Sequence, residues 1–278
     1  MTLRLHTHQN QTVNKRPRVF DDTITGEWWK SSRVHSPHER SAPENLPNEE
    51  SAMFNVLEIS EPKSYKEAKN STNWPDWEKA FEEEIKSLQE NNVWQVVPRP
   101  QSRKVVGGKW VCKVKGDALG QVERFKARYV AKGFTQIKGL DYDETFAPVV
   151  RFDSLRILLA ISASKRWKPR QLDIKTAFLY GILNEEIYLE LPEGYKIANQ
   201  VARLNRCIYG LKQSPRAWYF RLIEYILPLG FKISDFDPCV IIHNSGNLIV
   251  AIYVDDIVLF GEQGELMNTT FDLLKKGI

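Results

Sequence analysis

The sequence predicts an α+β fold built on an antiparallel sheet with helices on one face. Segments of helical periodicity interleave with short runs of β-branched residues, which indicates both kinds of element in one chain. The last two runs, "LIVAIY" and "IVLF", are separated by only three residues. They therefore form a hairpin and cannot be the parallel neighbours of a β-α-β unit. A chain of 278 residues with 42% hydrophobic residues is long enough to bury a substantial core.

The first 60 residues are expected to form a disordered leader, because they hold four prolines, many Ser, Asn and Thr residues, and no sustained periodicity. The N-terminus has no continuous apolar core, which excludes a secretory signal, and no apolar run reaches the roughly 18 residues of a membrane span. Three widely spaced cysteines indicate a reducing, intracellular setting and argue against a disulfide framework.

Residues 61–92 are expected to form an approach segment that contains an amphipathic helix. Apolar residues recur at helical spacing behind Pro75, and acidic residues crowd the first turns: Trp77, Phe81, Ile85 and Leu88 form the apolar stripe. The stretches "VWQVV", "KWVCKVK" and "RFKARYVAKG" then alternate as strands do, with glycine-containing turns between them.

The second half of the chain alternates between helices and strands. "FDSLRILLAISASKRW" predicts a helix capped by Asp153, with Leu155, Leu158 and Leu159 facing inward. "RQLDIKTAFLYG" predicts a strand that ends at Asp173. A further helix begins at Pro215, followed by the strand "PCVIIH", the hairpin, and a last helix over 264–275.

Charge is distributed unevenly along the chain. Residues 101–133 contain nine Lys and Arg residues against two acids, a net charge of +7, whereas the whole chain has +4. Arg124, Lys126 and Arg128 recur at period two, so they share one face of a strand. A cationic strand face of this density favours a polyanionic partner over an ordinary solvated, lysine-rich surface.

The hairpin places two adjacent carboxylates, Asp255 and Asp256, at its tip. Aspartate is a common turn residue, and a solvated turn is the simplest explanation. A divalent cation is the alternative, because Asp173 at the end of a neighbouring strand would add a third hard oxygen donor, and such a set suits Mg²⁺. Without a cation, the three carboxylates would repel one another and raise one another's pKa values.

Other catalytic arrangements are largely excluded. Only His243 lies outside the leader, and the chain has neither G-x-x-x-x-G-K-[ST] nor G-x-G-x-x-G. Two Mg²⁺ ions roughly 3.5–4 Å apart would activate a primer 3′-hydroxyl and stabilise a leaving pyrophosphate, while the basic strand face holds the triphosphate. One mechanism thus uses both the clustered acids and the basic block.

These residues also carry a resemblance to a known family. "KWVCKVK", "RFKARYVAKGFTQIKGLDYDETFAPVVRFDSLR", "QLDIKTAFLYG", "YLELPEGY", "CIYGLKQSPRAWY", "DPCV" and "YVDD" follow one another in order. Over about residues 61–278 the chain resembles the reverse transcriptase of copia-type LTR retrotransposons, part of a Pol polyprotein. The resemblance implies a right-hand polymerase, with fingers and an antiparallel palm sheet over residues 93–278, that acts as an RNA-directed DNA polymerase.

The resemblance also implies roles for individual residues. Asp173, Asp255 and Asp256 match the catalytic carboxylates, which hold two Mg²⁺ ions together with the backbone carbonyl of Ile174. Phe178 matches the aromatic residue that excludes a ribose 2′-hydroxyl. The remaining matches are Lys126, Arg128 and Gly210 for the nucleotide, and Tyr253, Ser214 and Pro215 for the template–primer. Tyr209 stands where retroviral relatives carry Gln.

The implied partners are an RNA or DNA template with its primer and deoxynucleoside triphosphates, with no membrane. The implied location is the cytoplasm, within a virus-like particle of the parent element. The family continues past the position of Ile278 into the thumb and ribonuclease H, with an integrase elsewhere in the polyprotein, so the chain is expected to be a truncated piece. The alternative is a catalytically silent relic of the element that only binds nucleic acid.

Overall fold

The computed structural model describes residues 60–117 and 121–276. All of these residues lie within one compact unit, Phe54–Ile278. The expected leader over residues 1–60 lies outside the described residues, apart from Ser60. Within the described ranges, no helix is long and apolar enough to cross a membrane.

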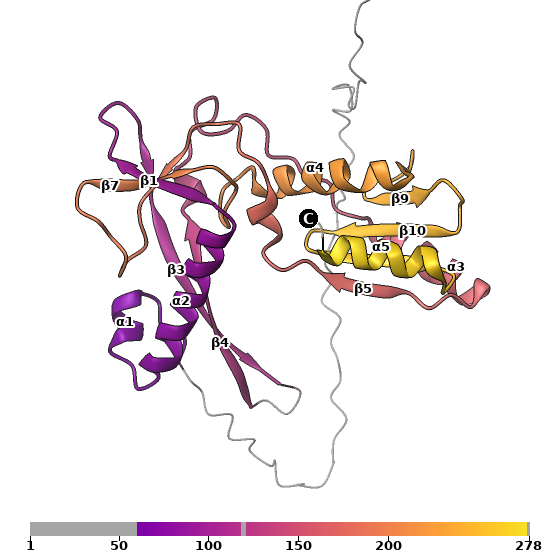
Figure 1. The fold of residues 1–278 in the computed structure, drawn as a ribbon, viewed down its shortest axis with the longest axis horizontal. Helices are drawn as coiled ribbons and strands as arrows, with labels where there is room; N and C mark the ends of the chain where they lie inside the picture. Colours follow the sequence, from indigo (N-terminus) through magenta and orange to yellow (C-terminus); the bar gives the residue numbers. More distant parts are fainter. Residues whose placement is uncertain (1–59, 118–120, 277–278) are drawn as a thin grey trace, which may run out of the picture. The chain divides into compact units, whose positions relative to one another are not determined.

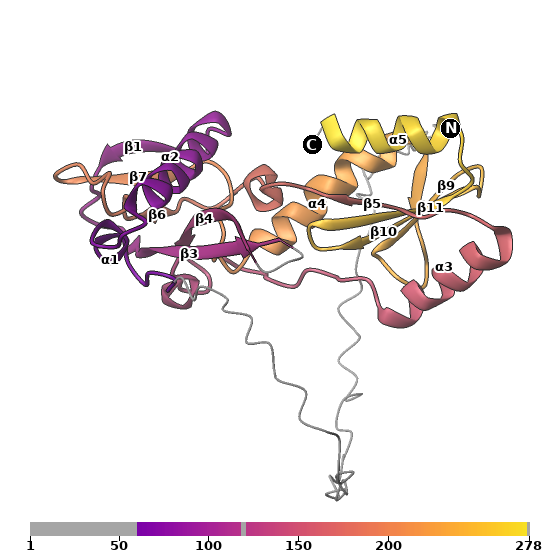
Figure 2. The same cartoon turned by 90° about the horizontal axis from the view of Figure 1, so that it is seen from below.

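A five-stranded, fully antiparallel sheet organises the C-terminal half (Figures 1 and 2). Its strand order is β5-β11-β10-β9-β8, with bounds Arg170–Asp173, Asp256–Gly261, Leu248–Tyr253, Val240–His243 and Phe231–Ile233. Helices α3 (Phe152–Lys165), α4 (Ser214–Ile226) and α5 (Glu265–Lys276) pack against it. The predicted hairpin and the antiparallel sheet are thus confirmed.

The sheet differs from the expected one-sided arrangement. Figure 2 shows α5 and α3 on opposite sides of the strands. On β10, the consecutive residues Val250, Ala251 and Ile252 are all buried. Because successive side chains of a strand point to opposite faces, burial of consecutive residues requires cover on both faces. The sheet is therefore buried more deeply than a simple apolar–polar alternation predicts.

A second core lies around α2 (Trp74–Glu90) and the hairpin of β3 (Gly108–Gly116) and β4 (Val122–Ala131). Residues Trp77, Phe81, Ile85 and Leu88 of α2 are buried there, as the helical spacing predicts. The short helix α1 (Tyr65–Lys69) packs beside α2. A four-stranded sheet adds β1, β7, β6 and β2, with bounds Trp94–Pro98, Gln200–Leu204, Tyr188–Leu189 and Val105–Val106. Its β2–β6 pair is parallel.

Helix α3 corrects two details of the prediction. The helix begins at Phe152 with Arg151 at the cap position, so Asp153 lies in the first turn, where it pairs with Arg156 and caps no backbone N–H. Leu158 is 5% exposed but Leu159 is 50% exposed. The buried face runs through Leu155, Leu158 and Ser162, and Leu159 is rotated about 100° from Leu158 around the helix.

Candidate functional site

The hairpin between β10 and β11 has a two-residue turn, Val254–Asp255, because Tyr253 pairs with Asp256. Asp256 is therefore the first residue of β11 and not part of the turn, where the sequence placed both acids. Val254 has φ +57°, a left-handed conformation that is uncommon for a β-branched residue. The indole Nε1–H of Trp218, which is buried on α4, donates to the carbonyl of Val254 at 2.8 Å and holds the turn in place.

Strand β5 brings Asp173 beside this turn. Asp173 is the cross-strand partner of Asp256, and the Ile174 backbone N–H donates to the Asp255 carbonyl at 2.9 Å. The Asp256 carboxylate accepts a hydrogen bond from Gln171 Nε2 at 2.9 Å. Across residues 60–117 and 121–276, no three His, Cys, Asp or Glu side chains are gathered closely enough to hold a metal ion together. The backbone thus juxtaposes the three predicted acids, while the side chain of Asp256 is held by Gln171.

Asp173 and Asp255 line the same cavity, of about 220 Å³, as the basic face of β4. Arg124, Lys126 and Arg128 all contribute to its wall. The intervening residues Phe125 and Ala127, with Tyr129, pack in the core around α2, which confirms that the cations share the other face of the strand. Burial lowers the pKa of the Lys126 ammonium, and the neighbouring Arg128 and Arg124 lower it further, while Asp173 opposes the shift. The structure therefore brings the predicted acids and cations together from segments far apart in the sequence.

Two aromatic side chains, Tyr209 and Phe178, lie next to the basic strand β4. The Arg128 guanidinium lies over the Tyr209 ring, 5.0 Å from its centroid, and the Phe178 ring meets Tyr209 edge-on, with centroids 5.0 Å apart. Burial raises the pKa of the Tyr209 hydroxyl. Phe178 is partly buried in the short 3-10 helix η2 (Ala177–Tyr180) and packs against the core of the five-stranded sheet. Tyr209 thus connects the basic strand to Phe178.

The segment before α4 is held tightly by the chain itself. Gly210 has φ +90°, and a Cβ at this position would lie 2.2 Å from the carbonyl oxygen of Ala131. Ser214 is 1% exposed, and its hydroxyl donates to the Ile208 carbonyl at 2.6 Å. Pro215 stands in the first turn of α4, where its missing N–H costs nothing. The Ser214 hydroxyl is therefore used in a hydrogen bond within the chain. Pro215, by contrast, is partly exposed.

Sequence reasoning missed Glu84 on α2, a buried acid that also lines the cavity. Glu84 is 8% exposed and lines the same cavity as Asp173 and Asp255, and its carboxylate accepts a hydrogen bond from the Tyr129 backbone N–H at 3.1 Å. Burial raises the pKa of Glu84 to about 7, against the opposing effects of that hydrogen bond and of Arg128 and Lys126. The sequence does contain a signal for the burial of Glu84, because this position lies within the apolar stripe of the helix, one residue before Ile85.

Glu84 should make the stability of the protein depend on pH. An acid whose pKa is higher in the folded state stabilises the fold below its unfolded pKa of about 4.5, and this contribution is lost as pH rises through about 7. Relative to Glu84→Gln, the wild-type chain should lose up to about 3 kcal/mol of unfolding free energy between about pH 5 and pH 8. Urea unfolding at both pH values measures the difference. The exposed neighbour Glu83→Gln is the control, and identical pH dependence in all three proteins would contradict the expectation.

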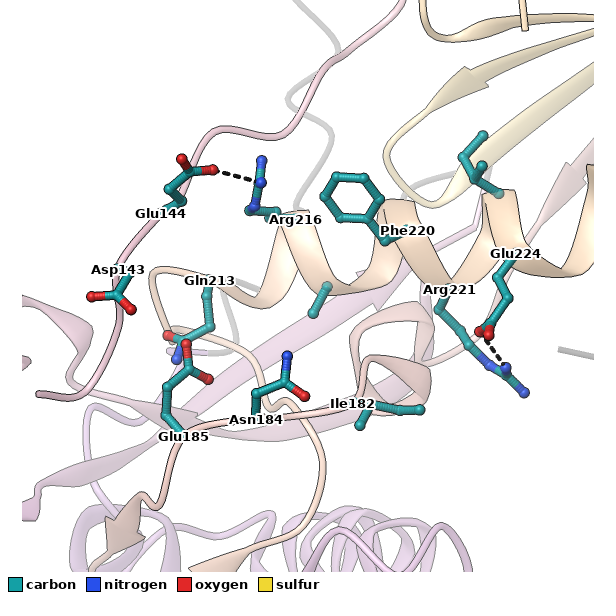
Figure 3. A pocket seen from close by; sticks show the side chains of 12 residues that line it. Asp143, Glu144, Ile182, Asn184, Glu185, Gln213, Arg216, Phe220, Arg221 and Glu224 are labelled. Atoms are coloured by element: carbon teal, nitrogen blue, oxygen red, sulfur yellow. Dashed lines mark hydrogen bonds and ion pairs between the residues drawn. The ribbon is translucent and has the colours of Figure 1, made fainter. Parts of the chain in front are cut away.

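A larger cavity, of about 720 Å³, lies along α4 and contains none of the predicted site residues (Figure 3). Its two arginines are paired, Arg216 with Glu144 at 2.5 Å and Arg221 with Glu224 at 2.9 Å. Asp143 and Glu185 add further acids to the lining. Acids therefore outnumber arginines in the lining of this cavity, which makes it unsuited to a polyanion.

Comparison with known proteins identifies the family. The family model described as reverse transcriptase (RNA-dependent DNA polymerase) matches residues 91–277. The chain is 39% identical over 227 residues to the retrovirus-related Pol polyprotein from transposon TNT 1-94 of Nicotiana tabacum, covering 79% of this chain and 17% of that protein. It is 40% identical over 206 residues to the corresponding polyprotein from transposon RE1 of Arabidopsis thaliana, covering 72% of this chain and 14% of that protein.

A shorter relative is the uncharacterized mitochondrial protein AtMg00820 of Arabidopsis thaliana, 42% identical over 88 residues, which cover 32% of this chain and 52% of that protein. The chain therefore spans about a sixth or less of the length of the two Pol polyproteins. With the ordered motifs, the family model and these relatives in agreement, this chain belongs to the reverse transcriptase family, as a reverse transcriptase domain of a copia-type Pol polyprotein.

Proposed function

We propose that residues 61–278 act as an RNA-directed DNA polymerase module, which adds deoxynucleotides to a primer 3′-hydroxyl on an RNA or DNA template. The observation that supports this most directly is the shared cavity, in which Asp173 and Asp255 meet the cationic face of β4. Phosphoryl transfer needs little covalent chemistry from the protein, so positioning and charge stabilisation are the main contributions.

The carboxylates suit a divalent cation, because Asp173 and Asp255 are hard oxygen donors at one cavity, which Ile174 also lines. Asp256 would join them if its carboxylate left Gln171. A bound Mg²⁺ pair would supply Lewis-acid activation of the primer hydroxyl and charge stabilisation at the leaving oxygens. The residues of the chain do the rest: Lys126 and Arg128 hold the triphosphate, and the hydrogen bond from the Ile174 N–H to the Asp255 carbonyl keeps Asp173 beside the turn that carries Asp255.

The fold suggests how the parts of such a polymerase are distributed. We assign the five-stranded sheet with α3, α4 and α5 to the palm, and the β3–β4 hairpin with its surrounding elements to the fingers. Residues 61–92 form the approach segment, which packs on the fingers through α2. Tyr253 is 45% exposed at the end of β10 and Pro215 is partly exposed, so both are available to a template–primer.

A second candidate function is binding of nucleic acid without catalysis. The hydrogen bond between Gln171 and Asp256, which diverts one of the three acids, favours it. Primer extension on poly(rA)–oligo(dT), run beside a salt-titrated binding assay, separates the two functions. Extension that Asp255→Asn abolishes without loss of binding supports the polymerase. Salt-sensitive binding with no extension leaves only the second function.

Phe178 provides a test of sugar selection. If its ring lies under the deoxyribose, Phe178→Val should open space for a 2′-hydroxyl and raise ribonucleotide incorporation by roughly tenfold or more relative to deoxynucleotide incorporation. The measurement is the ratio of the two kcat/KM values, because selectivity is a difference in transition-state binding. Tyr180→Val, which alters the same 3-10 helix, is the control. An unchanged ratio in a folded Phe178→Val protein would show that Phe178 is only a packing residue.

A further inference from the structure

Helix α2 contributes one carboxylate to a surface otherwise made of packed apolar residues. Trp77, Phe81, Ile85 and Leu88 fill the stripe, and Glu84 lies among them, whereas its neighbours Glu82 and Glu83 are exposed. A buried carboxylate costs free energy unless a partner compensates it. No ion pair to Glu84 is found among residues 60–117 and 121–276, where its one hydrogen-bond donor is the Tyr129 backbone N–H. Because burial of this carboxylate costs free energy, packing alone does not explain why a glutamate stands at this position.

The hydrogen bond to Tyr129 joins Glu84 to the free edge of β4. The other edge of this strand pairs with β3, so the Tyr129 N–H points away from that hairpin and toward α2. Two residues further along the same edge, the Ala131 N–H donates to the Tyr209 carbonyl at 2.8 Å. Glu84 and Tyr209 therefore hold successive positions on one strand edge. Arg128 directly precedes Tyr129 on β4, and its guanidinium lies over the Tyr209 ring.

Several other charged groups face the cavity that Glu84 lines. They come from three elements besides α2: the basic strand β4, the end of β5 with the residues after it, and the β10–β11 turn. They are Arg124, Lys126, Arg128, Asp173, Lys175 and Asp255. On its own helix, Glu83 also reaches the cavity, from an exposed position. Ionised Glu84 opposes the attraction of the cations for a polyphosphate, and neutral Glu84 does not.

We propose that Glu84 is a positioning residue of the polyphosphate site: it anchors the edge of β4 that presents Lys126 and Arg128, and a bound triphosphate selects its protonated form. The inference rests on the proposed function, since it assigns this cavity to the triphosphate of the incoming nucleotide. Through Tyr129 and Tyr209, α2 takes part in the site although it lies before residue 91, where the match to the family model begins.

Proton linkage gives the expected sign and size of the effect. Burial raises the pKa of Glu84 to about 7 in the free protein, and a nearby anion raises it further. An increase of one unit on binding makes the triphosphate bind about fivefold more weakly at pH 8 than at pH 6, through Glu84 alone. Glu84→Gln keeps a carbonyl oxygen for the Tyr129 N–H but removes this titration.

The test is an equilibrium titration of the 278-residue chain with deoxythymidine triphosphate, in EDTA and at low salt, at pH 6 and pH 8. The wild-type dissociation constant should rise about fivefold more between these pH values than that of Glu84→Gln. Titration of the ligand and of Lys126 occurs in both proteins and cancels in the comparison. Glu82→Gln, at an exposed position of α2 that does not line the cavity, is the matched control and should follow the wild type. Lys126→Ala should weaken binding at both pH values.

A second measurement covers the case in which Glu84→Gln fails to fold, as judged by circular dichroism. Calorimetric titration of the wild type near pH 7.5, in two buffers of different ionisation enthalpy, should show net proton uptake beyond that of the ligand. Equal pH profiles for wild type and Glu84→Gln, or no net uptake, overturn the role of Glu84 and leave the polymerase proposal intact. Absence of triphosphate binding at either pH, or binding unaffected by Lys126→Ala, overturns the cavity assignment as well.

Discussion

Replacing Asp173 by Asn is expected to lower primer extension by several orders of magnitude. Asp173 and Asp255 line the cavity that the basic residues of β4 also line. Asp173 pairs with Asp256 across the strands, which places Asp173 next to the β10–β11 turn. Loss of a carboxylate ligand removes charge that a divalent cation needs, and with it a main source of transition-state stabilisation. Asp255→Asn should have a comparable effect. Asp256→Asn should be milder, because the Asp256 carboxylate already accepts a hydrogen bond from Gln171.

The measurement is single-nucleotide extension with Mg²⁺, in a chimera in which residues 61–278 replace the matching segment of an active copia-type reverse transcriptase. Asp272→Asn, on the exposed side of α5, is the control for removal of one negative charge. Template–primer binding should persist in all variants, because the cations of β4 are untouched. Near-normal extension by Asp173→Asn would show that this carboxylate is not part of the catalytic site.

Replacing Gly210 by Ala is expected to destabilise the protein strongly and to disturb the site. Two costs combine: an L-residue at φ +90° is strained, by roughly 1–2 kcal/mol, and the new Cβ would lie 2.2 Å from the Ala131 carbonyl oxygen. That contact is with backbone, so β4 and the Tyr209 segment would have to separate. Their hydrogen bond from the Ala131 N–H to the Tyr209 carbonyl would then be lost as well.

Gly246→Ala is the matched control, because Gly246 has φ +74° but no atom within 4 Å of the position of an added Cβ. The difference between the two variants in urea unfolding isolates the steric term, which we expect to exceed about 2 kcal/mol. Equal destabilisation by both substitutions would mean that β4 and the Tyr209 segment are free to move apart. Gly210 would then be required only for its backbone conformation.

The amino-acid sequence by itself determined the order and type of the main elements and the family. Periodicity identified α2, because residues four apart on a helix share a face, and the two short apolar runs identified the β10–β11 hairpin. Period two also placed Arg124, Lys126 and Arg128 on one strand face, opposite the buried residues of β4. Each of these inferences needs only neighbours along the chain, and local patterns contain that information.

The tertiary structure alone decided how distant segments meet. Leu159 of α3 matched an apolar pattern yet is half exposed, since the helix buries a narrower stripe than its composition suggested. Asp256 entered β11 rather than the turn, because strand register places Tyr253 opposite it. Glu84 became part of the cavity only because α2 covers the free edge of β4, where the Tyr129 N–H needs an acceptor. Burial and pairing between segments far apart in sequence set these outcomes, and no local pattern encodes which partner a given edge or face will receive.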